Sequence, residues 1–345
     1  MMKAIVYTQY GSPDVLQLQE VARPLPEKGE LLVKVHATGL NAADRLGLSG
    51  QPFIARLAMG GLRRPKHTIL GADVAGVVEA VGSGVTTFRP GDAVFGDISG
   101  AGFGGLAEYV CAPEGVWALK PEGVSFEQAA ATPMAAVTAL QGLRDKGQLR
   151  AGQRVLIHGA SGGVGTFAVQ IAAALRGEVT AVCSARNADM VRALGATHVI
   201  DYAREDFARN GPRYDLILAA NGHRPIGDYR RALAPGGVYV VSGGSMTQIF
   251  QGILLGPVLS RFGDKRMGNL AAMPNVDDLA TVGEWLEKGT IRTVIDRCYP
   301  LSETAEAFRY LAEEHARGKV VITAAGATQS QPSSLAFEPA ATART

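Results

Sequence analysis

A glycine-rich turn between an apolar strand and an apolar helix constrains the fold of this chain more than any other feature. Residues 157–165 read IHGASGGVG, with a β-like run at 154–157 and a helix-like run at 163–175. Glycines permit the tight turn and let a pyrophosphate approach the backbone, and the helix N-terminus supplies unpaired N–H groups for the phosphates. A loop that only turns the chain is the alternative, which the surrounding strand–helix–strand pattern disfavours. The turn therefore predicts a dinucleotide site.

Strands and helices alternate around this turn from about residue 153 to residue 243. Such alternation with short connections predicts an α/β fold, in which helices cover both faces of a doubly wound parallel sheet. The expected strands lie at 154–157, 179–184, 198–201, 216–219 and 238–242, and the expected helices at 163–175, 187–194 and 226–233. Two later helices, at 276–288 and 304–314, and a last strand at 319–323 complete the expected elements.

The first 120 residues have a different character, with short β-like runs between glycine and proline turns. These runs lie at 3–7, 31–37, 74–81 and 107–112. They predict a compact, mostly β domain. Ser125, with Gln128 three residues later, is typical of a helix start. The polar insertion at 51–67 has no assigned structure, and the tail at 325–345 is expected to be disordered because it lacks periodicity.

The composition limits the class of protein. A chain of 345 residues is long enough for two domains. Its 34 Lys and Arg against 32 Asp and Glu leave a net charge of +2, so neither nucleic acid nor a membrane surface is expected as the main partner. No run is apolar enough for a secretory signal or a membrane span, and a cytoplasmic protein is expected. The three cysteines, Cys111, Cys183 and Cys298, fit a reducing compartment and exclude a four-cysteine zinc site.

The end of the second strand of the α/β part decides which dinucleotide is expected. NAD sites usually place an acid there, which binds the ribose 2′-hydroxyl. This chain instead has Ser184, which can donate to a 2′-phosphate, and Arg186, which can bind it through a charge-assisted hydrogen bond. Tyr202, after the third strand, adds a hydroxyl group. NADPH is therefore favoured over NADH; the alternatives are that Ser184 only caps a helix and that Arg186 is an ordinary exposed charge.

Six blocks of sequence resemble the medium-chain dehydrogenase/reductase superfamily, in particular its zinc-independent, quinone oxidoreductase-like branch. The blocks are TGLNAAD at 38–44, GAD at 71–73, GDAVFG at 91–96, the turn at 162–165, LGATHVIDY at 194–202 and GKVVI at 318–322. The resemblance runs from residue 1 to about 323. It implies a GroES-like, partly open β-barrel over 1–125, completed by about 290–324, and an inserted Rossmann domain over 126–289. The active site is then expected in the cleft between the two domains.

The resemblance also bears on metal binding. Zinc-dependent members of the superfamily bind a catalytic metal through residues at the positions of Asn41, Ala72 and Met134. A catalytic zinc needs three protein ligands that offer N, S or O, and these side chains provide none of normal strength. We therefore expect no metal. His36 and His67, which in principle recruit metals, are more typical of structural positions.

Without a metal, another group must stabilise the oxygen that becomes negative when a hydride arrives. A quinone or an α,β-unsaturated carbonyl compound delocalises the incoming electrons, so that hydrogen-bond donors suffice. Similar proteins place the residue equivalent to Asn41 near the nicotinamide, which makes its amide the candidate donor. Asp44 is the candidate that orients Asn41, and Arg45 is expected to face the cleft. The alternatives are a turn residue at Asn41 and an ordinary helix-start acid at Asp44.

Further cofactor contacts follow from the resemblance alone. Thr138 is expected to contact the nicotinamide carboxamide, and Lys319 is expected to close over the cofactor from the other domain. The alternative for Lys319 is a charge that flanks the last strand. The remaining expected contacts are Ser161, Gly162, Gly163 and Val164 at the pyrophosphate, and Asn221, Ser242 and Gly243 at the carboxyl ends of two strands.

The expected function is metal-free hydride transfer from NADPH to a small quinone, enone or carbonyl substrate. An alcohol or carbonyl dehydrogenase of the same fold is one alternative, and a protein that binds NADPH without turnover, as a sensor or interaction module, is another. We also expect a homodimer. The apolar stripe within 246–269 is interpreted as core, as a dimer contact or as a pocket wall.

Overall fold

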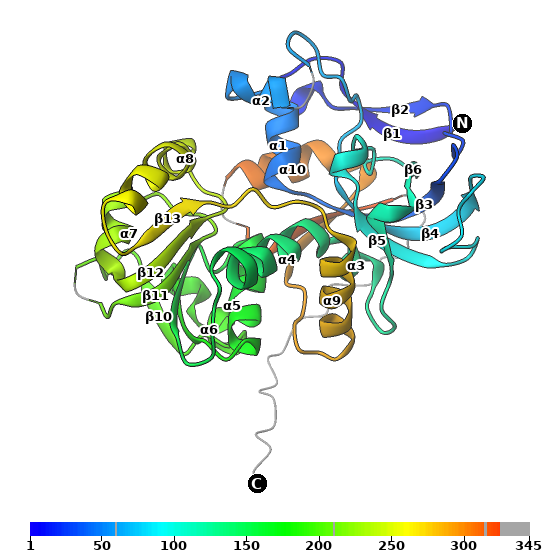
Figure 1. The fold of residues 1–345 in the computed structure, drawn as a ribbon. Helices are drawn as coiled ribbons and strands as arrows, with labels where there is room; N and C mark the ends of the chain where they lie inside the picture. Colours follow the sequence, from blue (N-terminus) through cyan, green and yellow to red (C-terminus); the bar gives the residue numbers. More distant parts are fainter. Residues whose placement is uncertain (59–60, 210, 314–315, 325–345) are drawn as a thin grey trace.

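Two large sheets organise the molecule, one parallel and one mixed, and they lie on opposite sides of Figure 1. The computed structural model describes residues 1–58, 61–209, 211–313 and 316–324. Helices cover both faces of the parallel sheet, and the mixed sheet is built mainly from the N-terminal part of the chain. The predicted fold class, a doubly wound α/β sheet with a second, β-rich part, is confirmed.

The parallel sheet has the strand order of a Rossmann fold. In that order the strands are β10 (His198–Asp201), β9 (Glu178–Cys183), β8 (Arg154–His158), β11 (Tyr214–Ala219), β12 (Leu233–Val241) and β13 (Arg266–Asn269). The helices around the sheet are α5 (Gly163–Ala174), α6 (Ala188–Ala193), α7 (Ile226–Ala232) and α8 (Met246–Arg261). Successive strand residues point to opposite faces. Val155 and Ile157 therefore pack against α5 and α6, while Leu156 packs in the core on the α7 side.

The mixed sheet combines strands from the two ends of the chain. Its order is β14 (Ile295–Pro300), β15 (Lys319–Thr323), β3 (Glu30–Gly39), β4 (Asp73–Val81), β5 (Ala93–Asp97) and β7 (Trp117–Leu119), with β6 (Tyr109–Pro113) paired to β3. A separate pair is formed by β1 (Met2–Val6) and β2 (Gln17–Val21). The register places Val321 opposite Gly39, so the last strand lies beside the first long one.

Six further α-helices belong to the described part of the chain. They are α1 (Ala42–Ser49), α2 (Phe53–Ala58), α3 (Phe126–Ala130), α4 (Pro133–Leu140), α9 (Val276–Glu287) and α10 (Thr304–Ala312). Leu48 of α1 and Phe308 of α10 belong to one buried core, and the two helices are neighbours in Figure 1. The predicted helix start is confirmed, because Ser125 Oγ accepts a hydrogen bond from Gln128 N at 3.2 Å. A proline cannot donate the backbone hydrogen bond of a continuous helix, which accounts for the break before Pro133.

Several short elements are absent from the sequence prediction. These are β2, β5, β7, β13 and β14, together with α1 and with α2 inside the 51–67 insertion. The strand β13 reads RMGN and buries only Met267, so it carries no alternating pattern that identifies a strand. The strands β2 and β14 have no buried residue, so their sequences likewise lack the alternation of buried and exposed positions that identifies a strand. The tail at 325–345 lies outside the described residues.

The start of β15 contacts both halves of the molecule. Gly318 N donates to Ser161 O of the glycine-rich turn at 2.8 Å, and Lys319 N donates to Val294 O at 2.9 Å. On the side of the mixed sheet, which lies in the expected GroES-like barrel, Leu40 N donates to Val320 O at 2.9 Å. Gly318 has φ +78°, and a Cβ there would lie 2.2 Å from Val294 O, so only glycine fits this crossing. The glycine-rich turn and the barrel are thus joined at one short segment.

Candidate active site

A cleft lies where the glycine-rich turn faces the start of β15 and the N-terminus of α1. It is lined by eight of the predicted residues, namely Asn41, Gly162, Gly163, Val164, Asn221, Ser242, Gly243 and Lys319. Arg45 also lines it, as expected from the sequence. Asn41 and Lys319 are 278 residues apart in the chain, and the pairing of β15 with β3 brings them together.

Close packing shapes the turn between β8 and α5. Gly159 has φ +81°, a conformation that favours glycine, and a Cβ at Gly165 would lie 2.1 Å from the carbonyl oxygen of Gly159. Gly162 is the N-cap residue of α5, whose first N–H groups face the cleft region. A Cβ at Gly163 would meet Lys319 Cδ at 3.1 Å. The turn therefore has the small residues and the helix N-terminus that suit a dinucleotide's phosphates.

A second cavity continues from this turn toward the ends of β9 and β10. Ser184, Arg186 and Tyr202 line it together with Ser161. The structure thus brings the three residues predicted for the 2′-phosphate into one space. The Ser184 hydroxyl accepts a hydrogen bond from Asn187 Nδ2 at 3.2 Å.

Among the residues of this second cavity that the sequence prediction lacks, two follow a strand of the parallel sheet. His223 and Arg224 line it just after the end of β11. Arg224 is held in place by ion pairs with Asp206 and Asp228, each at 2.9 Å. Their position after a strand of the parallel sheet, two and three residues beyond Asn221, is the signal that identifies them, since ligands bind at the carboxyl ends of such strands.

A buried polar network forms the barrel side of the cleft. Asn41 Nδ2 donates to Gly39 O at 3.2 Å and to Asp73 Oδ2 at 2.9 Å, while Asn41 Oδ1 accepts from Lys319 Nζ at 2.5 Å. The Lys319 ammonium lies 3.5 Å from Asp73 Oδ2. Asp73 is fully buried and Lys319 is 3% exposed. Burial raises the pKa of Asp73 to about 7, although the Lys319 ammonium opposes this shift. The sequence prediction names Lys319 and Asn41 but not Asp73.

Asp44 lies behind this network and faces away from solvent completely. Its Oδ2 accepts from Asn41 N at 2.8 Å, and its Oδ1 accepts from Gly71 N at 2.9 Å. Burial raises its pKa to about 6, while these two backbone hydrogen bonds and Lys319 partly offset the shift. Asp44 thus fixes the backbone of Asn41 and the loop before β4.

The three positions that the resemblance assigns to zinc ligands in zinc-dependent members lie around Asp73. Met134 N donates to Asp73 Oδ1 at 3.0 Å, Asn41 donates to Asp73 Oδ2, and Ala72 precedes it in the chain. An amide, a methyl group and a thioether are a poor ligand set for Zn²⁺. Within the residues that the structure describes, no three His, Cys, Asp or Glu side chains form a group that could hold a metal ion.

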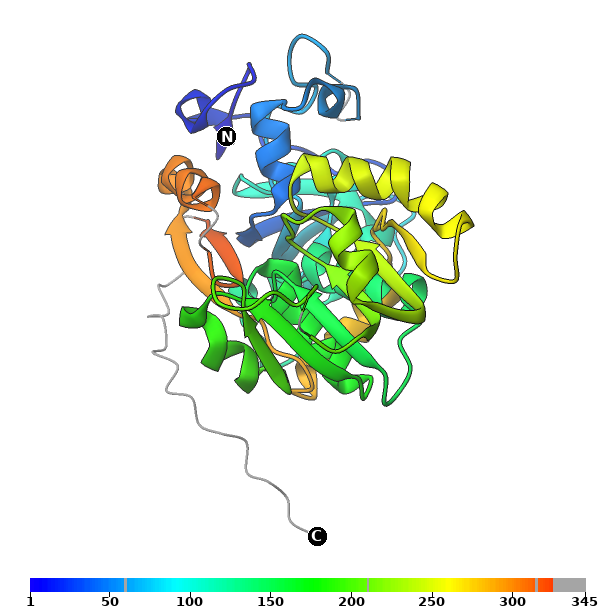
Figure 2. The same ribbon diagram turned by 90° about the vertical axis from the view of Figure 1, so that its left-hand side faces the viewer.

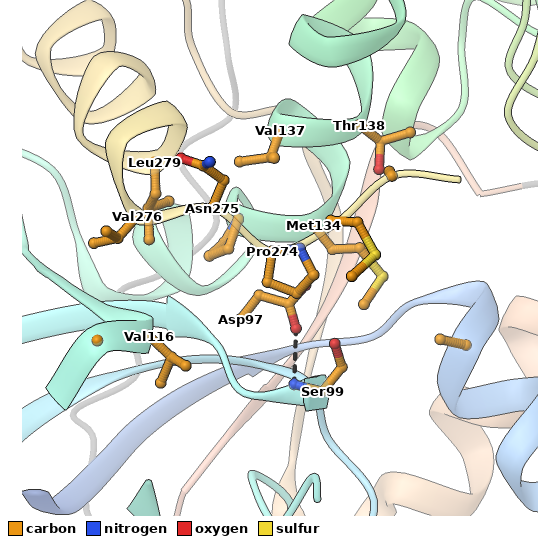
Figure 3. Close-up of a pocket in the computed structure, with 15 residues that line it drawn as sticks. Asp97, Ser99, Val116, Met134, Val137, Thr138, Pro274, Asn275, Val276 and Leu279 are labelled. Atoms are coloured by element: carbon orange, nitrogen blue, oxygen red, sulfur yellow. Dashed lines mark hydrogen bonds between the residues drawn. The ribbon is translucent and has the colours of Figure 1, made fainter. Parts of the chain in front are cut away.

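An adjacent pocket lies between the barrel and the N-termini of α4 and α9 (Figure 3). Its wall is mostly apolar, with Val116, Met134, Val137, Pro274, Val276 and Leu279. Asp97 supplies a carboxylate, whose Oδ1 accepts from Ser99 N at 2.9 Å and whose pKa burial raises. Thr138 lines this pocket. Residues 272–276 form part of this wall and connect β13 to α9. The sequence analysis predicts no strand at β13, so it does not identify the segment that follows as part of a pocket.

The apolar stripe of α8 faces outward. Ile253 is 46% exposed, Leu254 66%, Leu255 45% and Val258 51%, so the interpretation as core is wrong for these side chains. On its opposite side the helix packs closely against the parallel sheet through glycine, since a Cβ at Gly252 would lie 2.4 Å from Val241 Cγ1 of β12. Figure 2 shows α8 on the outside of the parallel sheet. Throughout the described part of the chain, no helix is both long and apolar enough to cross a membrane.

Two family models match the chain. The model for the alcohol dehydrogenase GroES-like domain matches residues 27–122, and the model for zinc-binding dehydrogenases matches residues 194–322. The second match covers only the Rossmann part and the return to the barrel. It therefore says nothing of Asn41, Ala72 and Met134, which all precede it.

Similar proteins span nearly the whole chain. The chloroplast envelope quinone oxidoreductase homolog of Arabidopsis thaliana is 33% identical over 93% of this chain and 98% of its own length. The chloroplastic NADPH-dependent alkenal/one oxidoreductase of the same plant is 34% identical over 93% of this chain and 79% of its own. Among solved structures, the quinone oxidoreductase from Coxiella burnetii superposes with a TM-score of 0.83 at 32% identity. That superposition covers 93% of this chain and 99% of the other.

His158, the last residue of β8, lines the second cavity and contacts Tyr229 in the core of the parallel sheet. It is 8% exposed, and its Nδ1 lies 2.8 Å from Tyr229 Oη. Burial, together with the nearby charges of Arg224 and His223, lowers the pKa of His158 to about 4. Because the unfolded chain has a histidine pKa near 6.5, the unfolded state binds the proton more tightly than the folded state.

Stability is therefore expected to fall as the pH falls from 6.5 toward 4. Between pH 7.5 and pH 5, His158 alone should remove about 2 kcal/mol from the free energy of unfolding. A His158→Asn variant, which keeps a polar group near Tyr229 but does not titrate, should lose about 2 kcal/mol less than the parent protein over the same range. Urea unfolding of both proteins at the two pH values measures the difference, and parallel losses would show that His158 is not the responsible group.

Proposed function

The chain belongs to the quinone oxidoreductase-like branch of the medium-chain dehydrogenase/reductase superfamily, and we propose that it reduces a quinone or an α,β-unsaturated carbonyl compound with NADPH, without a metal. One observation carries this proposal: at the three positions that zinc ligands occupy in zinc-dependent members of the superfamily, this chain has Asn41, Ala72 and Met134, which lie beside the buried carboxylate of Asp73. The names of the similar quinone and alkenal/one oxidoreductases support the same reaction class. The domain boundaries and the cytoplasmic location expected from the sequence stay predictions.

The cleft fits a dinucleotide on structural grounds. The turn packs closely because Gly159 and Gly165 have no Cβ, and the N–H groups at the start of α5 beside the cleft are suited to phosphate oxygens. Gly162, Gly163 and Val164 would hold the pyrophosphate. When bound, the cofactor supplies the hydride. The residues of the chain then orient it toward the acceptor, exclude water and stabilise the charge that develops.

The apolar pocket beside Thr138 suits a planar, uncharged acceptor. Val116, Val137 and Leu279 offer apolar contacts, and the carboxylate of Asp97 disfavours an anionic substrate. A conjugated acceptor spreads the incoming electron pair over several atoms. It therefore needs hydrogen-bond donors rather than a strong Lewis acid.

The direct test follows NADPH oxidation with matched acceptors. An enone should be reduced with a kcat/KM at least 100-fold above that of the saturated ketone with the same carbon skeleton, and a p-quinone should also react. Dialysis against a metal chelator should leave these rates unchanged. Faster reaction of the saturated ketone would identify an alcohol or carbonyl dehydrogenase instead, and NADPH binding without oxidation by any acceptor would identify a non-catalytic binding protein.

Cofactor preference is proposed to depend on Ser184, Arg186 and Tyr202, which share the second cavity. Arg186→Glu should raise the Kd of NADPH at least tenfold, because it replaces a charge-assisted hydrogen bond with repulsion of the 2′-phosphate. The Kd of NADH, which has no 2′-phosphate, should change less than threefold. Fluorescence titration measures both constants. Arg192→Glu, on the exposed side of α6, is the charge-matched control. Equal losses for the two cofactors would contradict the assignment.

We further propose a homodimer that uses the outer side of the parallel sheet. In the described part of the chain β13 is an edge strand, and the exposed apolar side chains of α8 lie next to it. An unpaired strand edge beside an apolar helix is typical of a contact surface. A two-fold contact would pair the edge strands and cover both helices.

Light scattering after gel filtration tests the homodimer. The protein should have twice the 36.1 kDa mass of the chain. Leu254→Arg should shift it toward the monomer, because the substitution places a charge in the apolar surface without disturbing the core. Leu119→Arg, at an equally exposed leucine of β7, should leave the mass unchanged. A monomeric parent protein would overturn this part of the proposal.

A further inference from the structure

We propose that Lys319 is the catalytic residue that donates a hydrogen bond and then a proton to the acceptor's oxygen, and that Asn41 and Asp73 are its positioning residues. This inference rests on the proposed function and assigns its chemistry to one group. The sequence prediction instead gives the donor role to the amide of Asn41 and a cofactor contact to Lys319. The contacts in the cleft distinguish the two assignments.

The amide of Asn41 is already engaged within the protein. Its two N–H groups donate to Gly39 O and Asp73 Oδ2, and its carbonyl oxygen accepts from the Lys319 ammonium. An amide has two N–H donors and one carbonyl acceptor group. Asn41 would have to break one of these buried hydrogen bonds to reach a substrate, which costs free energy because the former partner is left unsatisfied. Its contacts suit a residue that holds a neighbour in place.

The ammonium of Lys319 has donor capacity that Asn41 lacks. It carries three N–H groups, and its hydrogen bonds to described residues are those to Asn41 Oδ1 at 2.5 Å and Asp73 Oδ2 at 3.5 Å. A well-formed bond between an ammonium and a carboxylate measures about 2.7–2.9 Å, so Asp73 is close enough to lower the cost of burial but binds Lys319 loosely. One N–H group is left for a ligand in the cleft that Lys319 lines.

The position of the ammonium is set by both halves of the molecule. The Lys319 backbone is bound to Val294 O, and the preceding Gly318 is bound to Ser161 O of the glycine-rich turn. The side chain passes over Gly163, where even a Cβ would lie 3.1 Å from Lys319 Cδ. A charge that is fixed relative to the cofactor turn needs little reorganisation when negative charge appears, and this is the condition for effective electrostatic stabilisation.

Reduction of an enone begins at its β-carbon. The β-carbon accepts a hydride from the nicotinamide C4, so one C–H bond forms, NADPH is oxidised and the acceptor is reduced by two electrons. The C=C electron pair moves to the bond between the α-carbon and the carbonyl carbon, and the C=O pair moves to oxygen. Lys319 stabilises this oxygen and passes it a proton, which gives an enol and a neutral amine. Solvent returns a proton to the amine, and the enol tautomerises to the saturated ketone.

The test separates catalysis from cofactor binding. Lys319→Met keeps the length of the side chain but cannot donate, and it should lower kcat for the enone 100- to 1,000-fold. The Kd of NADPH, measured by fluorescence titration, should change less than fivefold. Lys319→Ala should regain at least tenfold activity in the presence of ethylammonium, a small amine that fits the vacated space. Lys288→Met, on the exposed side of α9, should match the parent protein.

A double-mutant cycle tests the positioning role. Asp73→Asn should lower kcat about tenfold in the parent protein and less than twofold in the Lys319→Ala background, because Asp73 acts through Lys319. Equal effects in both backgrounds would overturn that role. An unchanged kcat with a much weaker NADPH affinity in Lys319→Met would overturn the catalytic role and leave Lys319 as a cofactor contact. A parent protein inactive with every acceptor would instead defeat the proposed function itself, before any variant is compared.

Discussion

The crossing of the chain at Gly318 and Lys319 is the contact on which the rest of the structure depends. One hydrogen bond joins this segment to the glycine-rich turn, and the next residues complete the mixed sheet beside β3. The same segment therefore pairs with β3 of the mixed sheet and binds the glycine-rich turn. It also places the Lys319 ammonium beside Asp73.

Burial of charge is the main energetic cost of this arrangement. Asp44 and Asp73 are fully buried, and Asp97 and Lys319 are nearly so. Each carboxylate is held by backbone or side-chain donors. The charge of Asp97 raises the pKa of Asp44 and of Asp73, and the Lys319 ammonium lowers the pKa of all three carboxyl groups. Buried ion pairs seldom contribute much to stability, since desolvation offsets their attraction. Their presence at the cleft is better explained by the need to hold polar groups where negative charge develops.

Much of the fold could be predicted because its signals are local. The glycine-rich turn, the alternation of strands and helices and the capping pair Ser125 and Gln128 all lie within short windows. The short strands β13 and β14 could not be predicted, because pairing with neighbours rather than their own pattern defines them. The same limit applies to the site. Asp73 and Lys319 are 246 residues apart, and neither segment indicates the other.

The pocket in Figure 3, which we propose binds the acceptor, is built largely from other segments than the buried network that we propose carries the reaction. Its wall at 272–276 belongs to the segment that connects β13 to α9, whereas the buried network is built from β15, the N-terminus of α1 and the start of β4. Substitutions in the connecting segment can change which acceptors fit while every hydrogen bond of the network stays in place. A lineage of such proteins can therefore diversify in its substrates at little risk to its reaction, because the two properties are encoded in different parts of the gene.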